Sequence, residues 1–348
     1  MGDDFGALLR VVRPAVEARL EALFRDRLEG VGSRYGRDVH AMIDAARDLT
    51  LRSAKRFRAA LLAIAYGGVD PHAPFEPALQ GGVAIELLQT YLLIQDDWMD
   101  GDLTRRGGPS VHALLGERLG SHLGASSAIL GSDFTWGLAV STLASIEAPA
   151  KQVVAALRLF TVIHEDVIIG QQIDMLGRTE DVDVMHDLKT GSYTVRGPLA
   201  LGATLAGAEP EALEALARFA QPLGIAFQLR DDLLGTFGSA AVTGKPVGND
   251  LRAGKRTAII AEAEARLDDH NPRGREALDQ VFGNASASDD EVAAAASALE
   301  ACGAREAVHA RLLRLCREAA ELAASLPLAP AARAQLAGAA RALEAVTS

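Results

Sequence analysis

Three aspartates, Asp96, Asp97 and Asp100, stand at the end of an apolar stretch. At 3.6 residues per helical turn, Asp96 and Asp100 lie one above the other with Asp97 beside them. Carboxylates this close raise one another's pKa unless a cation neutralises them. Mg2+ is suited to this task, because it uses one or two protein carboxylates and takes its other ligands from water and substrate phosphates. Arg105 and Arg106 follow in a Gly-rich loop and could grip such a phosphate as a bidentate fork.

The alternative is a solvated helix end without chemistry. The paired acids Asp3-Asp4, Asp268-Asp269 and Asp289-Asp290 lie in polar or capping contexts, whereas Asp96 directly follows the apolar segment 91–94. The helix that ends at Asp96 should therefore be buried almost to its end. Taken alone, this cluster leaves both interpretations open.

A second acidic pair favours the functional interpretation. Asp231 and Asp232 end another apolar helical run, GIAFQLRDDLLG, and a Gly-rich segment with lysines, TGKPVGNDLRAGKRT, follows. Two facing carboxylate clusters, each backed by a cationic loop, would form a clamp for a metal-bound diphosphate.

With these motifs in this order, the chain resembles the isoprenyl diphosphate synthases, also called polyprenyl synthetases, from about Lys55 to Arg256. The matching pieces are AKRFR, DDWMD with RRGG after it, GQQID, KTGSYT, and FQLRDDLLG with GKPVGNDLRAGKRT. The helical pattern throughout predicts an all-α fold. The resemblance implies a single domain over 1–348, a helical bundle around a central cavity.

The resemblance also implies an activity, the Mg2+-dependent head-to-tail condensation of isopentenyl diphosphate with an allylic diphosphate. The allylic C–O bond would ionise, the isopentenyl double bond would attack the cation, and the released pyrophosphate would take the proton. Three Mg2+ ions would hold the diphosphate. The implied metal ligands are Asp96, Asp97, Asp100, Asp231 and Asp232.

Further site residues follow from the same resemblance. Isopentenyl diphosphate would be held by Lys55, Arg58, Gln89 and Arg106. The departing pyrophosphate would be neutralised by Arg105, Lys189, Lys245 and Lys255. The substrate-binding set is completed by Gln171, Thr190 and Gln228. With the five aspartates, Arg105, Lys189 and Lys245 form the expected catalytic set.

Two positions depart from the family pattern. Ser53-Ala54 replaces the Gly-Gly that usually precedes Lys55 and Arg56, and Gly235 stands where the second motif most often has a third Asp. Position 235 lies one turn after Asp231, so the missing carboxylate should remove an outer or water-mediated contact and leave direct coordination standing. We expect an active enzyme with a weaker third metal site.

Product length should depend on Tyr91 and Leu92, five and four residues before Asp96. In similar enzymes, a bulky residue here limits elongation. An aromatic only at the farther position, without an insertion in the first motif, goes with a C20 product. The sequence therefore predicts geranylgeranyl diphosphate, with C15 farnesyl diphosphate as the alternative. A class I terpene cyclase and a non-catalytic heterodimer subunit are the rival functions.

Composition and net charge limit the classes of partner that are expected. The net charge of −11 over 348 residues argues against a nucleic-acid partner. Cys302 and Cys316 support neither a disulfide framework nor a zinc site, which favours a reduced, cytoplasmic setting. The N-terminus has no secretory pattern and no stretch is apolar enough to span a membrane. Members of the resembling family are commonly homodimers, and we expect one here.

The element pattern gives further expectations. Residues 7–29 read as a helix broken by Pro14, followed by a loop over 30–36. Ala78–Asp100 should form the central helix, and Lys189 should lie in a kinked helix. A mobile loop is expected over Gly235–Gly254. Three helices should end the chain, the first of them opened by a Ser288-Glu291 capping box.

Overall fold

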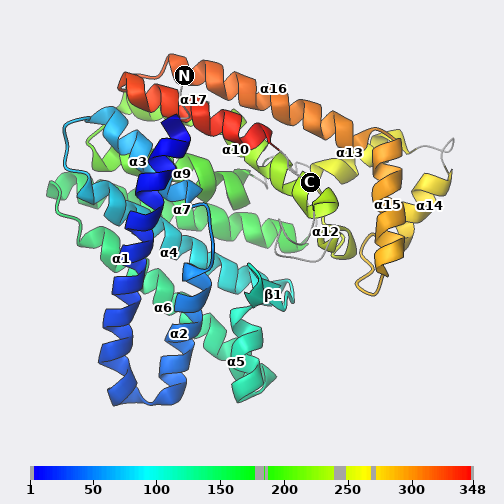
Figure 1. The fold of residues 1–348 in the computed structure, drawn as a ribbon, viewed down its shortest axis with the longest axis horizontal. Helices are drawn as coiled ribbons and strands as arrows, with labels where there is room; N and C mark the ends of the chain where they lie inside the picture. The colour runs from blue at the N-terminus through cyan, green and yellow to red at the C-terminus, as the bar shows by residue number, and fades with distance from the viewer. Residues whose placement is uncertain (1–3, 177–183, 185–186, 239–247, 268–271, 346–348) are drawn as a thin grey trace. The chain divides into compact units, whose positions relative to one another are not determined.

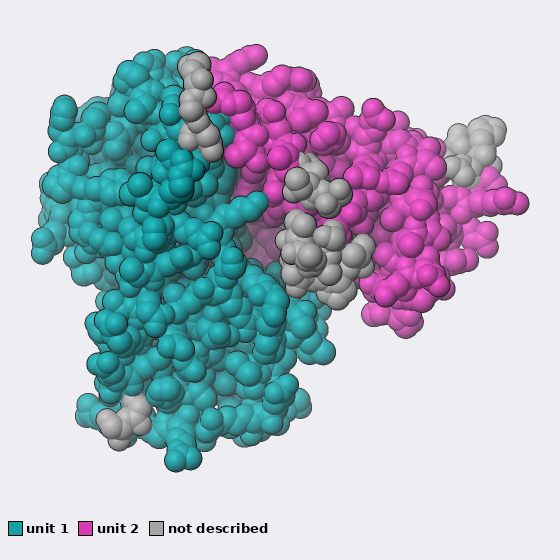
Figure 2. Space-filling view, in the orientation of Figure 1, with its two compact units in different colours: residues 1–164, 193–217, 323–338 teal, residues 165–192, 218–322, 339–348 magenta. Residues whose placement is uncertain are grey.

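The computed structural model describes residues 4–176, 184, 187–238, 248–267 and 272–345, which are almost entirely helical (Figure 1). Two compact units are distinguished in Figure 2. Unit 1 comprises residues 1–164, 193–217 and 323–338, and unit 2 comprises residues 165–192, 218–322 and 339–348. The predicted all-α fold is confirmed. A single domain over 1–348 stays a prediction.

Unit 1 is built around one buried helix. Its helices are α1 (Asp4–Tyr35), α2 (Arg37–Leu51), α3 (Phe57–Val69), α4 (Glu76–Met99), α5 (Val111–Leu119), α6 (Ser121–Ala144), α9 (Gly197–Leu205) and the first part of α7 (Ala150–Leu176). Helix α4 contacts α1, α2, α3, α5, α6 and α9. A helix with neighbours on all sides must be apolar all round, and α4 is buried along most of its length. This is the predicted central helix.

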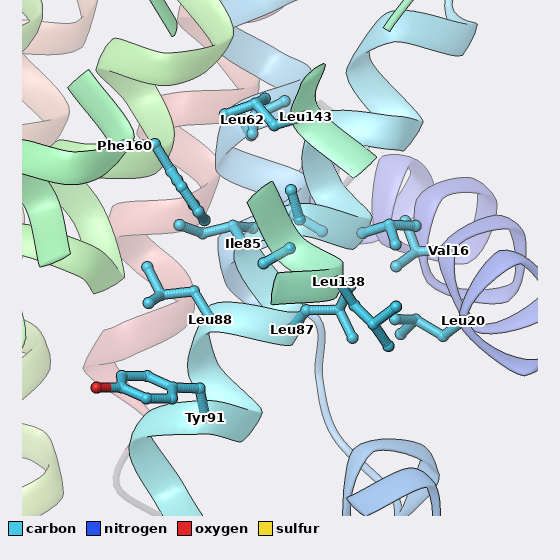
Figure 3. Packing of buried hydrophobic residues seen from close by; sticks show 14 of the residues in the cluster. Val16, Leu20, Leu62, Ile85, Leu87, Leu88, Tyr91, Leu138, Leu143 and Phe160 are labelled. Carbon is cyan, nitrogen blue, oxygen red and sulfur yellow. The ribbon is translucent and has the colours of Figure 1, made fainter. Parts of the chain in front are cut away.

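The core of unit 1 fixes the direction of α4. Figure 3 shows Leu88 and Tyr91 on one side of this helix, the side of Phe160, while Leu87 points toward Leu20 on the other. All five side chains are almost fully buried. Burial of each large apolar side chain stabilises the fold by roughly 1.5–3 kcal/mol. Core packing therefore holds α4 in place up to its C-terminal end, which carries the acidic side chains.

Helix α1 corrects two expectations. It runs without interruption through Pro14 and through the predicted loop over 30–36 to Tyr35. A proline inside a helix costs about 3 kcal/mol. Four large apolar side chains on this helix are fully buried, and together they outweigh that cost. They are Val12, Val16, Leu20 and Phe24.

A short hairpin follows α4. Strand β1 (Thr104–Arg105) pairs antiparallel with β2 (Gly108–Pro109), with Arg105 opposite Gly108. Arg106 lies at the turn with a positive φ of 51°. A positive φ is uncommon for a residue other than glycine, and here it places two consecutive arginines in different surroundings.

Unit 2 contains the end of α7, most of α10 (Pro210–Phe237), α12 (Asn249–Arg252), α13 (Ala258–Arg266), α14 (Pro272–Val281), α15 (Asp289–Ala301) and α16 (Ala304–Ala324). A π-helix, η1 (Asp187–Arg196), and α17 (Pro330–Glu344) each contribute residues to both units. Among the described residues, no helix is both long and apolar enough to cross a membrane.

The tail confirms the helix-start signal. Ser288 Oγ accepts a hydrogen bond from the Glu291 backbone N–H, and the Glu291 carboxylate accepts one from the Ser288 backbone N–H at 2.7 Å. The predicted capping box thus begins α15, and α16 and α17 follow as expected. The predicted loop over Gly235–Gly254 was partly wrong, because α10 continues to Phe237 and α12 occupies residues 249–252. Residues 239–247 lie outside the described residues.

Candidate active site

The first acidic cluster lies at the C-terminal end of α4, in unit 1. Asp97 is fully buried and forms an ion pair with Arg105. Arg105 Nη2 also donates to Asp96 Oδ2 at 3.2 Å and to Asp102 Oδ2 at 3.4 Å. Asp100 is the exposed residue that caps the helix. The carbonyl end of a helix carries partial negative charge, so this end of α4 concentrates negative charge from backbone and side chains.

Arg105 serves these carboxylates as a counter-ion. Burial disfavours its charge, but the carboxylates of Asp97, Asp96 and Asp102 outweigh burial, so the pKa of Arg105 is raised. The sequence placed Arg105 on the departing pyrophosphate. In the structure its guanidinium instead contacts the carboxylates that are expected to hold the metal.

A cationic cluster is centred on Gln89, which lies two turns before Asp96 on α4. The two neighbours of the Gln89 amide are guanidinium donors, so its oxygen is assigned to face them. In this orientation it accepts from Arg58 Nη1 at 3.0 Å and from Arg106 Nη2 at 3.1 Å. Arg58 Nη2 donates to Thr194 Oγ1 at 2.7 Å, and its guanidinium lies over the Tyr193 ring at 4.4 Å. Three residues predicted to hold isopentenyl diphosphate therefore converge.

The charge balance of this cluster favours an anion. The pKa of Arg106 is lowered to about 10, chiefly by burial; the charges of Arg56, Arg58 and Arg105 act in the same direction, and Glu86 opposes them. A guanidinium in such surroundings gains from a nearby phosphate, which it can bind in bidentate fashion. Lys55, the fourth predicted ligand, is exposed just before α3.

Arg56 is a structural residue rather than a substrate ligand. Its guanidinium donates to Glu86 Oε2 at 2.9 Å and to the Thr50 carbonyl at 2.7 Å, and it lies 3.3 Å from Glu17 Oε1. The Arg56 and Glu86 side chains are each 1% exposed. Arg56 neutralises the charge of Glu86 inside the apolar helix α4. The buried ion pair also anchors the segment that leads into Arg58.

Sequence reasoning missed Arg52. Its Nη1 donates to the backbone carbonyl of Arg105 at 2.6 Å, and its Nη2 donates to Asp48 at 2.6 Å. The guanidinium also lies against the hairpin, because a side chain at Gly108 would meet Arg52 Cζ at 2.7 Å. Arg52 therefore positions the hairpin that carries Arg105 and Arg106. Its place just before AKRFR gave no sign of this distant contact.

The second acidic cluster lies on α10, in unit 2. Asp231 is exposed, and Asp232 is buried. Asp232 accepts hydrogen bonds from Gln228 Nε2 at 2.7 Å and from the Ala258 backbone N–H at 3.1 Å. Burial raises the pKa of Asp232 to about 7, the charges of Asp250 and Asp231 raise it as well, and the two hydrogen bonds oppose this shift. A cation beside these carboxylates would favour the ionised form of Asp232.

The predicted residues of α7 and η1 also lie together in unit 2. Gln171 is buried, Asp174 is half-buried, and Lys189 Nζ binds Asp174 Oδ2 at 2.5 Å. Gly170 permits the close approach, because a side chain there would meet the Lys189 backbone nitrogen at 2.4 Å. The predicted kink around Lys189 is a π-helix in the structure, and Thr190 is half-buried within it.

The donor chemistry of both acidic clusters fits Mg2+. Among the described residues, no group of three or more His, Cys, Asp or Glu side chains is placed to hold a metal ion by itself. Mg2+ does not need such a group, since it keeps several waters and uses one or two carboxylates together with phosphate oxygens. Lys255 is half-buried beside the second cluster, and its backbone N–H donates to the Asp250 carbonyl at 2.9 Å. Lys245 lies outside the described residues.

Tyr91 belongs to an aromatic cluster in unit 1. Its hydroxyl lies 3.1 Å from His164 Nε2. The His164 ring stacks on Trp136 at 4.1 Å, and Trp136 stacks on Phe160 at 5.2 Å. Burial raises the pKa of Tyr91, which keeps its hydroxyl neutral. Leu92 is half-buried on the next position of α4.

Comparison with known proteins identifies the family. Residues 40–299 match the family described as Polyprenyl synthetase, which is three quarters of the chain. The chain belongs to the polyprenyl synthetase family. The family and the prenyltransferase class predicted from the motifs are thereby confirmed.

Two relatives and one solved structure show what this polyprenyl synthetase is similar to. It is 34% identical over 301 residues to a (2E,6E)-farnesyl diphosphate synthase of Mycobacterium tuberculosis, covering 84% of this chain and 80% of the relative. It is 31% identical over 274 residues to a geranylgeranyl diphosphate synthase of Methanosarcina mazei, covering 76% and 77%. A geranylgeranyl pyrophosphate synthase from Corynebacterium glutamicum, crystallised with isoprenyl diphosphate and magnesium, has a TM-score of 0.89 at 30% identity, covering 98% of this chain and 99% of that one.

Proposed function

We propose that this polyprenyl synthetase condenses isopentenyl diphosphate with an allylic diphosphate to give a short-chain isoprenyl diphosphate. The observation that carries the proposal is the pairing of two unlike sites on α4 and its hairpin. The Gln89 amide oxygen accepts hydrogen bonds from Arg58 and Arg106, whereas Asp96 and Asp97 form ion pairs with Arg105. A cationic site for one diphosphate and an acidic site for a metal-bound diphosphate are what a two-substrate reaction of this kind requires.

The residues proposed to hold Mg2+ are the carboxylates of both clusters. When bound, the metal would supply positive charge to the oxygens of the allylic diphosphate as the C–O bond breaks. Three ions are proposed, as the resemblance implies. The proposed ligands are Asp96, Asp97, Asp100, Asp231 and Asp232.

The remaining residues bind and orient the substrates. Arg58, Gln89, Arg106 and Lys55 would hold isopentenyl diphosphate so that its double bond faces the allylic carbon. The departing pyrophosphate would be neutralised by Lys189, Lys245 and Lys255, with Arg105 acting through the carboxylates that it pairs with. Gln171, Thr190 and Gln228 complete the substrate-binding set. The pyrophosphate would take the proton lost in the last step, so no protein nucleophile is needed.

The rival functions differ in what they need from the cationic cluster. A class I terpene cyclase ionises one diphosphate and has no use for a second diphosphate site. A non-catalytic partner subunit would have no need for the aspartates. The cluster around Gln89, with its cation-rich surroundings, supports the synthase.

Incubation of the purified protein with Mg2+, isopentenyl diphosphate and each allylic primer tests the proposal. We expect consumption of both substrates and formation of a longer allylic diphosphate. Excess EDTA should abolish the reaction. Cyclic hydrocarbon formed without consumption of isopentenyl diphosphate would instead identify a cyclase.

Product length is proposed to be C20, geranylgeranyl diphosphate, with C15 farnesyl diphosphate as the alternative. The buried aromatic cluster around Tyr91 supports the proposal that this side chain limits the growing chain one to two turns from Asp96. The relatives named above include both a farnesyl and a geranylgeranyl diphosphate synthase. The proposed product length therefore rests on the aromatic side chain at position 91.

Replacing Tyr91 by Ala should therefore shift the products to C25 and longer, because the change removes the bulk that stops elongation. Leu92→Phe should shorten the products. Tyr91→Phe is the matched control, since it keeps the ring and loses only the hydroxyl contact with His164. Chromatography of the dephosphorylated alcohols reads out the distribution. An unchanged distribution in Tyr91→Ala would remove Tyr91 as the limit and with it the basis of the C20 assignment.

A homodimer is also proposed, supported by apolar side chains that α6 and α7 leave exposed. They are Leu123, Leu130, Val154 and Val162. A Leu130→Glu variant should be monomeric by light scattering, because the interface would have to bury an unpaired charge. Val11→Glu, at an exposed position on α1, is the control and should leave the dimer intact. A monomeric wild type would contradict the proposal. A cytoplasmic location stays a prediction.

A further inference from the structure

The turn of the hairpin after α4 has a strained backbone. Arg106 and Gly107 form a two-residue turn between the paired residues Arg105 and Gly108, and their φ angles are 51° and 75°. A type I′ turn of this length requires a positive φ at both positions. Glycine adopts this conformation readily, whereas the Cβ atom of an arginine is crowded in it. Contacts outside the turn therefore have to stabilise the backbone of Arg106.

The hairpin is too short to provide this stabilisation by itself. Its strands β1 and β2 have two residues each, and Pro109, opposite Thr104, has no backbone N–H to donate to the ladder. The Ser110 backbone N–H donates to the Leu103 carbonyl at 2.9 Å and closes the open end of the hairpin. Isolated two-stranded hairpins are only marginally stable in water. The turn therefore depends on contacts with the rest of unit 1.

Arg52 provides such a contact at the pair of residues that closes the turn. Its Nη1 donates to the Arg105 carbonyl at 2.6 Å. Its guanidinium lies against Gly108, where a Cβ atom would be 2.7 Å from Cζ and 3.0 Å from both terminal nitrogens. Asp48 holds the guanidinium in turn, accepting from Nε at 3.1 Å and from Nη2 at 2.6 Å. The Arg52 side chain is 11% exposed, so these charged contacts are largely shielded from water.

The two arginines of the hairpin depend on the turn to different degrees. Arg105 pairs with three carboxylates, and these hold its guanidinium whatever the backbone does. Arg106 donates to the Gln89 amide oxygen at 3.1 Å, and its left-handed backbone sets the direction of its side chain. Loss of the turn conformation should therefore release Arg106 and leave Arg105 in place.

We propose that Arg52 is a positioning residue for the isopentenyl diphosphate site. By holding the Arg105 carbonyl and covering Gly108, it keeps Arg106 in the left-handed conformation that brings its guanidinium to Gln89. The role rests on the proposed function, and it adds to the site a residue that contacts the hairpin backbone and Asp48.

Arg52→Met tests the proposal, because it keeps the aliphatic stem and removes the guanidinium. The dissociation constant of isopentenyl diphosphate, measured by calorimetry, should rise by about tenfold or more, the effect of losing one charged hydrogen bond. Binding of inorganic pyrophosphate at saturating Mg2+ should stay within a few-fold of wild type, because the first acidic cluster keeps Arg105. A variant that is merely destabilised would weaken the binding of both ligands.

Two further variants and a second measurement make the test specific. Arg52→Lys keeps a cation that can reach the Arg105 carbonyl and should recover most of the affinity. Arg47→Met is the matched control, because Arg47 lies on the same helix and pairs with Asp44 and Glu21. It should leave the affinity unchanged. Hydrogen exchange of the backbone amides over residues 103–110 should be faster in Arg52→Met and unchanged in Arg47→Met.

Wild-type affinity for isopentenyl diphosphate in Arg52→Met would overturn the proposal. Equal losses of affinity for both ligands, or unchanged hydrogen exchange in the hairpin, would overturn it as well. Failure of the proposed function has a different signature. A wild type that binds isopentenyl diphosphate but does not add it to an allylic primer would refute the condensation and leave the role of Arg52 standing.

Discussion

Replacing Asp96 by Ala is expected to lower turnover by about three orders of magnitude and to leave the helical circular dichroism unchanged. The side chain lies in the last turn of α4, is partly exposed and pairs with Arg105, outside the apolar core. Its loss would remove charge stabilisation of several kcal/mol that a bound metal supplies, and each ~1.4 kcal/mol corresponds to a tenfold change in rate.

Asp102→Ala is the matched control for this prediction. Asp102 also contacts Arg105, at 3.4 Å, but it is not among the proposed metal ligands. Its loss should lower turnover by about tenfold or less, because the 3.4 Å contact is long and Arg105 keeps the carboxylates of Asp96 and Asp97. Turnover of Asp96→Ala near that of the wild type, or equal to that of Asp102→Ala, would refute its role as a metal ligand.

Replacing Arg56 by Ala is expected to lower the free energy of unfolding by about 3–5 kcal/mol, because Glu86 would be left buried without its partner. Urea denaturation measures the loss. Arg56→Met combined with Glu86→Leu should recover most of it, since an apolar pair of similar volume replaces both charges. A loss below 1 kcal/mol in Arg56→Ala would show that the pair does not hold this region together.

Arg58→Ala provides the contrast, two residues away. Its guanidinium joins Gln89 and Thr194 at the proposed isopentenyl diphosphate site. Truncation should raise the KM for isopentenyl diphosphate by about 10- to 100-fold, the effect of losing a charged hydrogen bond of roughly 1.5–3 kcal/mol. The KM for the allylic substrate should change little. Equal changes in both KM values would mean that Arg58 acts through stability alone.

These two arginines show where sequence reasoning reaches and where it stops. Spacing and charge marked Arg58, Gln89 and Arg106 as site residues, and the structure brings these three together. The same cluster of cations contained Arg56, but nothing local indicated that its partner would be Glu86, thirty residues on. Ion pairs depend on which elements pack together, and a single sequence does not display that.

Two predicted helix boundaries were wrong for a related reason. Local rules predicted a break at Pro14 and a loop from Gly235, and both positions lie inside helices. Burial of an apolar face outweighs the local cost of proline. The capping box at Ser288 was predictable because both of its partners lie within one turn.

The hairpin after α4 has a consequence for how this part of the chain can vary. Surface hairpins ordinarily accept insertions and deletions. Here Arg105 contacts Asp97, Arg106 contacts Gln89, and Arg52 holds the backbone between them. One added residue would separate the two arginines from their partners together, so the length of this turn is set by chemistry on both of its sides, and relatives that share both clusters should share its length.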